Sequence, residues 1–163
     1  GTYGRWLDTT SDPDTPVECP RKPAATDVDD ATAAAYLAPG RTDSYLWAYS
    51  VSPLRECGIF EATRNSAVTS FAVSCDADFP PGTTAPTWTP GLGNEANRVQ
   101  IVPPKGAEIG TGEGGIIRGR TMPPNHRITV GDISCTTLPD NGVECSAPTG
   151  RFRIEDGVLA ASS

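Results

Sequence analysis

The sequence predicts a mainly β protein, an antiparallel sandwich or small barrel with one short N-terminal helix, stapled by two disulfides. Gly and Pro, with 17 and 16 residues of 163, make up about a fifth of the chain, above the roughly 12% of average usage. Long stretches alternate apolar and polar residues, which indicates strands with one buried face. Four of the five cysteines flank turn sequences in two pairs. Together these observations favour a β fold over a helical bundle.

A single domain is expected over residues 26–163, after an irregular arm over residues 1–25. With 163 residues, of which 37% are hydrophobic, the chain has the size of one domain with one modest core. The arm is rich in proline and small polar residues and lacks an apolar period, although Trp6 and Leu7 could tether it.

The one expected helix lies in TDVDDATAAAYLAPG, residues 26–40. Thr26 or Asp27 would cap its N-terminus, acidic residues would fill its first turn, and Pro39-Gly40 would end it. The run of alanines between these signals predicts a helix of about three turns.

From Asp43 onward the apolar period changes to two, which predicts a series of strands. Turn sequences rich in Pro and Gly separate them, because Pro fixes φ and Gly tolerates a positive φ. The residues expected to face the core are Tyr45, Trp47, Tyr49 and Val51; Phe71, Val73 and Cys75; Val99 and Ile101; Ile128 and Val130; and Phe152 and Ile154.

The cysteines are best interpreted as structural disulfides. Zinc ligands are typically spaced as C-x₂₋₄-C, whereas the gaps here are nine and seventeen residues, and no C-x-x-C redox motif is present. In DISCTTLPDNGVECS, a turn with Gly142 at positive φ would place Cys135 opposite Cys145 on antiparallel strands. Their Cα atoms would then be about 4.5 to 5.5 Å apart, within disulfide range. Cys57 and Cys75 are expected to pair in the same way, and no metal site is predicted.

The disulfides predict a secreted protein or one on the extracytoplasmic surface of the cell envelope, because such bonds persist in oxidising compartments. Cys19, in the arm, is left over. We expect a free thiol there, and an intermolecular bridge is the alternative.

Short motifs along the chain carry a family resemblance: ECGIF with a later AVSC, then ITVGDISC, NGVEC and a closing TGRFRI. Together they resemble exported proteins of high-GC Gram-positive actinobacteria, including envelope lipoproteins and proteins of unknown function. In these, a C-G-I strand and a G-D-x-x-C…G-V-x-C hairpin before an aromatic strand recur. The resemblance spans residues 45–155. It implies an exported β domain at the cell envelope and no particular activity.

Charge and hydropathy argue against two kinds of partner. The net charge of -7 disfavours nucleic acid, because binding phosphates requires clustered Lys and Arg. The same acidity argues against adsorption to anionic lipid. No apolar run approaches the roughly 20 residues of a membrane helix, so we expect a chain that does not span a membrane.

A hydrolase triad would require His126, the single histidine, with Ser134 or Cys19 as nucleophile and Asp132 as the orienting carboxylate. However, Asp132 is expected in the strand that follows His126, PPNHR is a turn, and no G-x-S-x-G elbow is present. We therefore interpret His126 as a surface residue and predict no catalytic residue.

Two further motifs are interpreted as loops. GTGEGG, residues 110–115, would cradle a phosphate only if it opened a helix, and the following IIRGRTMPP does not open one. The acidic groups DPD, DVDD and DAD do not form a D-x-D-x-D-G calcium loop, so we assign them to solvated turns and helix capping. No cofactor-binding residue is predicted.

Two hypotheses for function follow. The preferred one is a non-enzymatic exported domain that binds an envelope component or another exported protein. Trp88 in APTWTPG either folds back over the core, which we favour, or stands exposed as a partner-binding anchor. The alternative is a secreted hydrolase that uses a carboxylate pair, for example Glu56 with Glu61 acting on a glycan.

Overall fold

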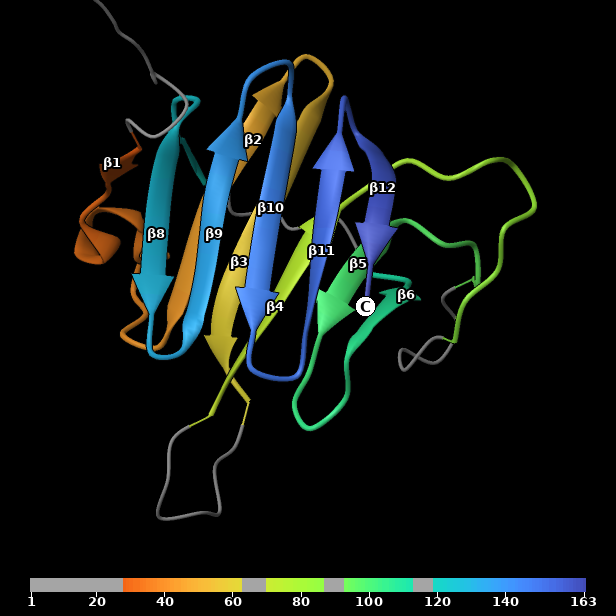
Figure 1. Cartoon of the computed structure of the whole chain (residues 1–163), viewed down its shortest axis with the longest axis horizontal. Coiled ribbons are helices and arrows are strands. Elements are labelled where there is room, and N and C mark those ends of the chain that lie inside the picture. The colour runs from red at the N-terminus through yellow and green to blue at the C-terminus, as the bar shows by residue number, and fades with distance from the viewer. Residues whose placement is uncertain (1–27, 63–69, 87–92, 113–118) are drawn as a thin grey trace, which may run out of the picture.

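The computed structural model describes residues 28–62, 70–86, 93–112 and 119–163. They form two six-stranded sheets packed face to face (Figure 1), so the predicted β-sandwich is confirmed. Sheet A has the strand order β1-β8-β9-β10-β11-β12, and sheet B has the order β6-β5-β4-β3-β2-β7. The strands are β1 (Asp29–Asp30), β2 (Ser44–Val51), β3 (Leu54–Glu61), β4 (Phe71–Asp76), β5 (Arg98–Ile101), β6 (Ala107–Gly110), β7 (Arg120–Thr121), β8 (His126–Val130), β9 (Ile133–Leu138), β10 (Gly142–Ala147), β11 (Gly150–Glu155) and β12 (Val158–Ser162).

Both sheets are mixed, which corrects the purely antiparallel arrangement that was predicted. β1 runs parallel to β8, and β7 runs parallel to β2. Each is a two-residue strand at a sheet edge, so neither leaves an alternating apolar pattern long enough to be recognised in the sequence. Within the described ranges, no helix has the length and apolarity to cross a membrane.

The predicted three-turn helix over residues 26–40 is wrong. Asp29–Asp30 forms β1 instead, and only a single-turn 3-10 helix, η2 (Ala33–Tyr36), follows. The backbone N–H of Ala31 donates to the Arg127 carbonyl at 2.8 Å. A short alanine-rich helix is marginal in water, so hydrogen bonds to the edge of sheet A outweigh its local propensity.

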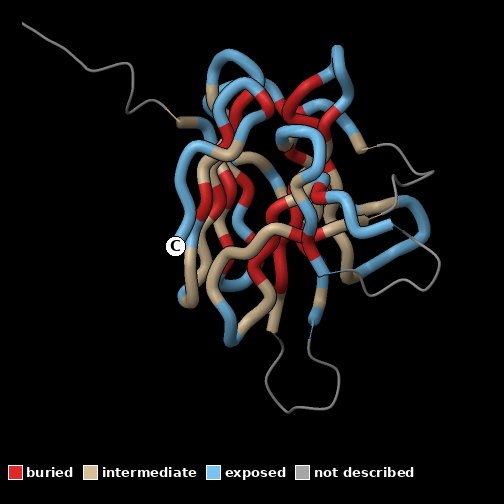
Figure 2. Tube along the Cα trace, turned by 90° about the vertical axis from the view of Figure 1, so that its right-hand side faces the viewer, coloured by how far each residue is buried: buried red, intermediate tan, exposed pale blue. Residues whose placement is uncertain are grey.

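The core lies between the two sheets, where Figure 2 shows the buried segments gathered. The predicted inward-facing pairs on β5, β8 and β11 are all buried, as are Trp47, Tyr49, Val73 and Cys75. Tyr45 and Phe71 are partly buried and pack against the core, whereas Val51 is 62% exposed. A bulge between Ala48 and Ser50 shifts the register of β2, and the side chain of Val51 is therefore solvated.

The β9–β10 hairpin forms where the sequence predicts it, but its turn differs in detail. Asp140 and Asn141 adopt the positive φ values of 59° and 60°, whereas Gly142 was expected to do so. Gly142 is instead the first residue of β10. A Cβ atom there would lie 2.7 Å from the Ile154 carbonyl oxygen, so close backbone packing requires the glycine.

Candidate functional site

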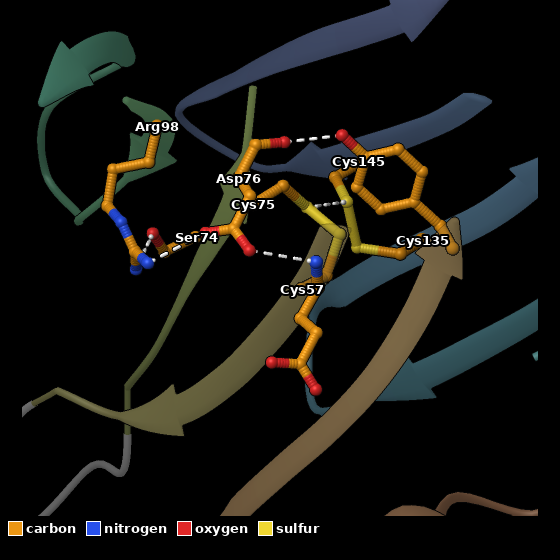
Figure 3. The surroundings of a disulfide bond; sticks show 9 residues. Cys57, Ser74, Cys75, Asp76, Arg98, Cys135 and Cys145 are labelled. Atoms are coloured by element: carbon orange, nitrogen blue, oxygen red, sulfur yellow. Dashed lines mark hydrogen bonds and ion pairs between the residues drawn. A yellow bond between two sulfur atoms is a disulfide. The ribbon is translucent and has the colours of Figure 1, made fainter. Parts of the chain in front are cut away.

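The four paired cysteines lie at the centre of the core, with one disulfide in each sheet. The bonds are Cys57–Cys75 and Cys135–Cys145, as predicted, and their Cα separations of 4.0 and 4.1 Å are slightly shorter than expected. Cys75 Sγ and Cys145 Sγ are 3.8 Å apart across the sheet interface (Figure 3). The two bonds indicate an oxidising, extracytoplasmic environment.

These sulfurs do not form a site at the protein surface. No paired cysteine is more than 1% exposed. The sulfurs of Cys57, Cys75 and Cys145 lie within 4.8 Å of one another, but each is bonded in a disulfide, and a metal requires thiolates. The cysteines therefore act here as cross-links of the scaffold.

The residues of the hypothetical triad do not come together. His126 begins β8 and Asp132 follows its end, so about 13 Å of strand separates them. Ser134 pairs in register with Thr129 on the solvent face, whereas His126 shares its side of β8 with buried Ile128. His126 Nδ1 lies 3.0 Å from the Pro124 carbonyl oxygen, and Nε2 lies 3.8 Å from Asp29 Oδ2. Cys19 lies outside the described residues.

The suggested carboxylate pair is also separated by the strand geometry. Glu56 and Glu61 are five residues apart on β3, so their side chains lie on opposite faces of sheet B. Glu56 Oε2 accepts a hydrogen bond of 2.6 Å from the Gly119 N–H. These two carboxylates cannot flank one glycosidic bond.

Asp76 and Asp78, the two carboxylates of the DAD motif, are paired with neighbouring groups. Asp76 Oδ1 accepts from Arg98 Nη2 at 2.8 Å, and Asp76 Oδ2 accepts from the Glu56 N–H at 2.9 Å (Figure 3). Asp78 accepts from Arg55 Nη2 at 2.5 Å. This hydrogen bond raises the pKa of the Arg55 guanidinium, although its burial opposes the shift. Ion pairing accounts for the DAD motif.

The start of the glycine-rich run is fixed by a neighbouring side chain. Gly110 ends β6, and Gly112 exchanges hydrogen bonds of 2.9 and 2.8 Å with the amide group of Asn97. Residues 113–115 of the run, and Trp88, lie outside the described residues. Both alternatives for Trp88, the favoured packing over the core and the exposed partner-binding anchor, therefore stay predictions.

The outer face of sheet A carries a shallow hollow of about 270 Å³. Ladder registers place two rows of side chains across it. One row is Arg127, Thr136, Glu144 and Arg153, and the other is Thr129, Ser134, Ser146 and Arg151. The central strands β9 and β10 contribute mostly short hydroxyl side chains, whereas β8 and β11 contribute arginines. The floor is consequently low, and long side chains stand on two sides. The lining residues are Arg127, Ser134, Thr136, Glu144, Ser146 and Arg151.

The arginines around the hollow differ in their ionic partners. Arg127 Nη2 lies 3.0 Å from Asp30 Oδ1, and Arg153 is paired with Glu144 at 3.5 Å and with Glu155 at 2.6 Å. In the part of the chain with assigned structure, Arg151 forms no ion pair and is exposed. Its positive charge is available to a ligand.

This hollow is not among the sites predicted from the sequence. Its signal was nevertheless present, because Ser134, Thr136 and Ser146 are the outward residues between core-facing positions of two predicted strands. The alternation of apolar and polar residues does not show which strands are neighbours. Strand pairing brings Arg127 and Arg151, 24 positions apart in sequence, to opposite sides of one floor.

Comparison with protein-family models, with curated proteins and with solved structures yields no match to this chain.

Proposed function

We propose that this chain is an exported, non-enzymatic binding domain that recognises a cell-envelope component through the hollow on sheet A. The observation that carries the proposal is the composition of that hollow, which combines three short hydroxyl side chains, two arginines and one glutamate on a continuous sheet face. These groups can donate and accept many hydrogen bonds.

The core beneath the hollow supports a binding role, because it makes the floor rigid. Cys135 and Cys145 are register partners on β9 and β10, and their disulfide lies on the inner side of the same two strands. Ser134 and Thr136 flank Cys135 in sequence, and Glu144 and Ser146 flank Cys145. The cross-link therefore holds the floor in place before a ligand arrives, which lowers the entropy lost on binding.

The proposed location is the outer surface of the cell envelope or the extracellular medium. Two disulfides support an oxidising compartment. The resemblance to exported actinobacterial proteins supports the envelope over other extracellular settings. An envelope component is also the ligand that such a protein would meet at the highest concentration.

The test is cosedimentation of the purified protein with insoluble envelope material from a high-GC Gram-positive bacterium. Ser146→Trp places a bulky side chain on the floor of the hollow and should reduce the bound fraction about tenfold, the equivalent of a 1.4 kcal/mol loss. Ala160→Trp, at an exposed position on β12 outside the hollow, is the matched control and should bind as the wild type does. Failure of the wild-type protein to sediment with the material would refute the proposal.

Trp88→Ala tests the other predicted contact in the same assay. A loss of binding in Trp88→Ala with none in Ser146→Trp would assign recognition to the segment around Trp88 instead of the hollow. His126→Ala should bind like the wild type, because its ring contacts Pro124 and Asp29 away from the solvent face of β9 and β10.

A further inference from the structure

The geometry points to a specific ligand class for the hollow: a glycan that carries carboxylate or phosphate groups, with Arg151 as the residue that recognises the negative charge. This inference rests on the proposed function and names its ligand. It follows from the hydroxyl groups of the floor, from the placement of the arginines and from the residue types that the lining lacks.

The floor suits a ligand with many hydroxyl groups. Ser134 and Ser146 are register partners, and Thr136 lies two residues along β9 from Ser134. Cross-strand Cβ atoms are about 5 Å apart, so neighbouring hydroxyls can contact successive groups of a sugar chain. Each hydroxyl both donates and accepts, as do the hydroxyls of a sugar. Glu144, which also lines the hollow, adds an acceptor for further sugar hydroxyls.

The arginines add a requirement for negative charge. Arg127 and Arg151 stand on β8 and β11, three strand spacings or about 14 Å apart at their bases. Asp30 holds the guanidinium of Arg127, whereas Arg151 has no ionic partner among residues of assigned structure. A guanidinium can bind a carboxylate or a phosphate with two parallel hydrogen bonds. The lining has two positive groups and one negative group, in a chain whose net charge is -7.

Other polymers fit this lining less well. A protein partner would require apolar or aromatic anchors, and a single-stranded nucleic acid would require aromatic platforms for its bases. The residues that line the hollow are all polar or charged and include no aromatic side chain. A neutral glycan could use the hydroxyls but would leave the charge of Arg151 without a counter-charge.

The decisive experiment measures binding of three soluble polymers by isothermal titration calorimetry: polygalacturonate for carboxylate, phosphorylated dextran for phosphate, and unmodified dextran as the neutral control. We expect at least one charged polymer to bind about tenfold or more tightly than dextran, with affinity that falls as salt is raised to about 0.15 M. The charged polymer that binds identifies the source of the negative charge.

Two variants assign the charge recognition to one side chain. Arg151→Gln should weaken binding of the charged polymer about tenfold. Arg41→Gln makes the same change in net charge at an exposed arginine that precedes β2 in sheet B, and it should bind like the wild type. Thr136→Val, which removes one hydroxyl and keeps the shape, should weaken binding while the thermal midpoint stays unchanged.

The outcomes separate this inference from the proposed function. If the protein binds envelope material through Ser146 but binds charged and neutral polymers equally, or binds none of the three, the ligand class is wrong and the binding role stands. Equal losses in Arg151→Gln and Arg41→Gln would show that net charge acts instead of the hollow, which also overturns the inference. If the wild-type protein binds no envelope material, the proposed function itself fails.

Discussion

Tyr49 shows how one buried polar side chain ties the stability of this fold to pH. The residue is 6% exposed, and its hydroxyl donates to the Asp76 carbonyl. Burial raises the pKa of the phenol well above its ordinary value, although the nearby cation of Arg55 opposes the shift. In the folded state the hydroxyl therefore keeps its proton at a pH where an unfolded tyrosine loses it.

The sign of the pH dependence follows from this shift. The contribution of Tyr49 is fully present below the unfolded pKa of about 10 and is lost above it, at up to about 1.4 kcal/mol per pH unit. Tyr49→Phe should lower the free energy of unfolding by about 1 kcal/mol at neutral pH, since the hydrogen bond is lost. The same substitution should also make the free energy of unfolding fall less steeply with pH above about 10. Urea denaturation of both proteins across this pH range measures the two slopes, and parallel slopes would contradict the assignment.

At the scale of elements, the β9–β10 hairpin gives a test of where the turn strain lies. Asn141→Gly should change the free energy of unfolding by less than about 0.5 kcal/mol, because glycine adopts a positive φ without cost. Gly142→Ala should cost about 1 to 3 kcal/mol, because its Cβ would collide with the backbone of β11. Denaturant midpoints of the two variants and of the wild type measure both changes in stability. The reverse ranking, with Asn141→Gly the more costly change, would show that Gly142 is not packed closely against the backbone of β11.

Elements fixed by nearby residues were predictable, and those fixed by distant partners were not. The inward faces of β5, β8 and β11 follow from alternation alone, and the Cys135–Cys145 bond follows from a short turn. The extended conformation of Asp29–Asp30 depends on His126 and Arg127, which are far away in the sequence. A helix propensity summed over a local window cannot anticipate that pairing.

The same distinction applies to the candidate site. Each outward residue of β9 and β10 could be predicted from its place between buried neighbours. The hollow also needs the order β8-β9-β10-β11 and its registers, which place Arg127 and Arg151 on either side. His126 and Glu56 are the residues whose side-chain chemistry is conspicuous in the sequence, and neither lines the hollow. The distant groups beside them, the Asp29 carboxylate near His126 and the Gly119 N–H on Glu56, are tertiary features.

In the molecule as a whole, each sheet contains one disulfide, and the two disulfides contact each other across the sheet interface. Replacing Cys57 and Cys75 by alanine, or Cys135 and Cys145, should cost about 3 kcal/mol in each case from loop entropy. Two of the sulfurs, one from each disulfide, are 3.8 Å apart. The stability lost by the variant that lacks all four cysteines should therefore differ from the summed losses of the two pair variants by about 0.5 kcal/mol or more. Guanidinium denaturation of the three variants and the wild type measures this coupling. A cost below about 1 kcal/mol for either pair would show that its bond constrains the unfolded chain little.

The backbone also closes one corner of the sandwich. The Ala107 N–H of sheet B donates to the Ser163 carbonyl at 2.9 Å, and the Ser163 N–H donates to the Arg151 carbonyl at 2.9 Å. The strand that carries Arg151 is thereby tied to the edge of the opposite sheet. The hollow is consequently supported from below by a disulfide and from the side by this closure, which suits a rigid recognition surface.

Recognition of a glycan through the hollow is tested by a map of amide chemical shifts, recorded by NMR as solubilised envelope glycan is added to the labelled protein. Shifts should concentrate on the outer face of β8 to β11, at Arg127, Ser134, Thr136, Glu144, Ser146 and Arg151. Amides of β5 and β6 in sheet B should stay unchanged. Shifts confined to sheet B or to the segment around Trp88, with no shift at the residues that line the hollow, would contradict recognition through the hollow.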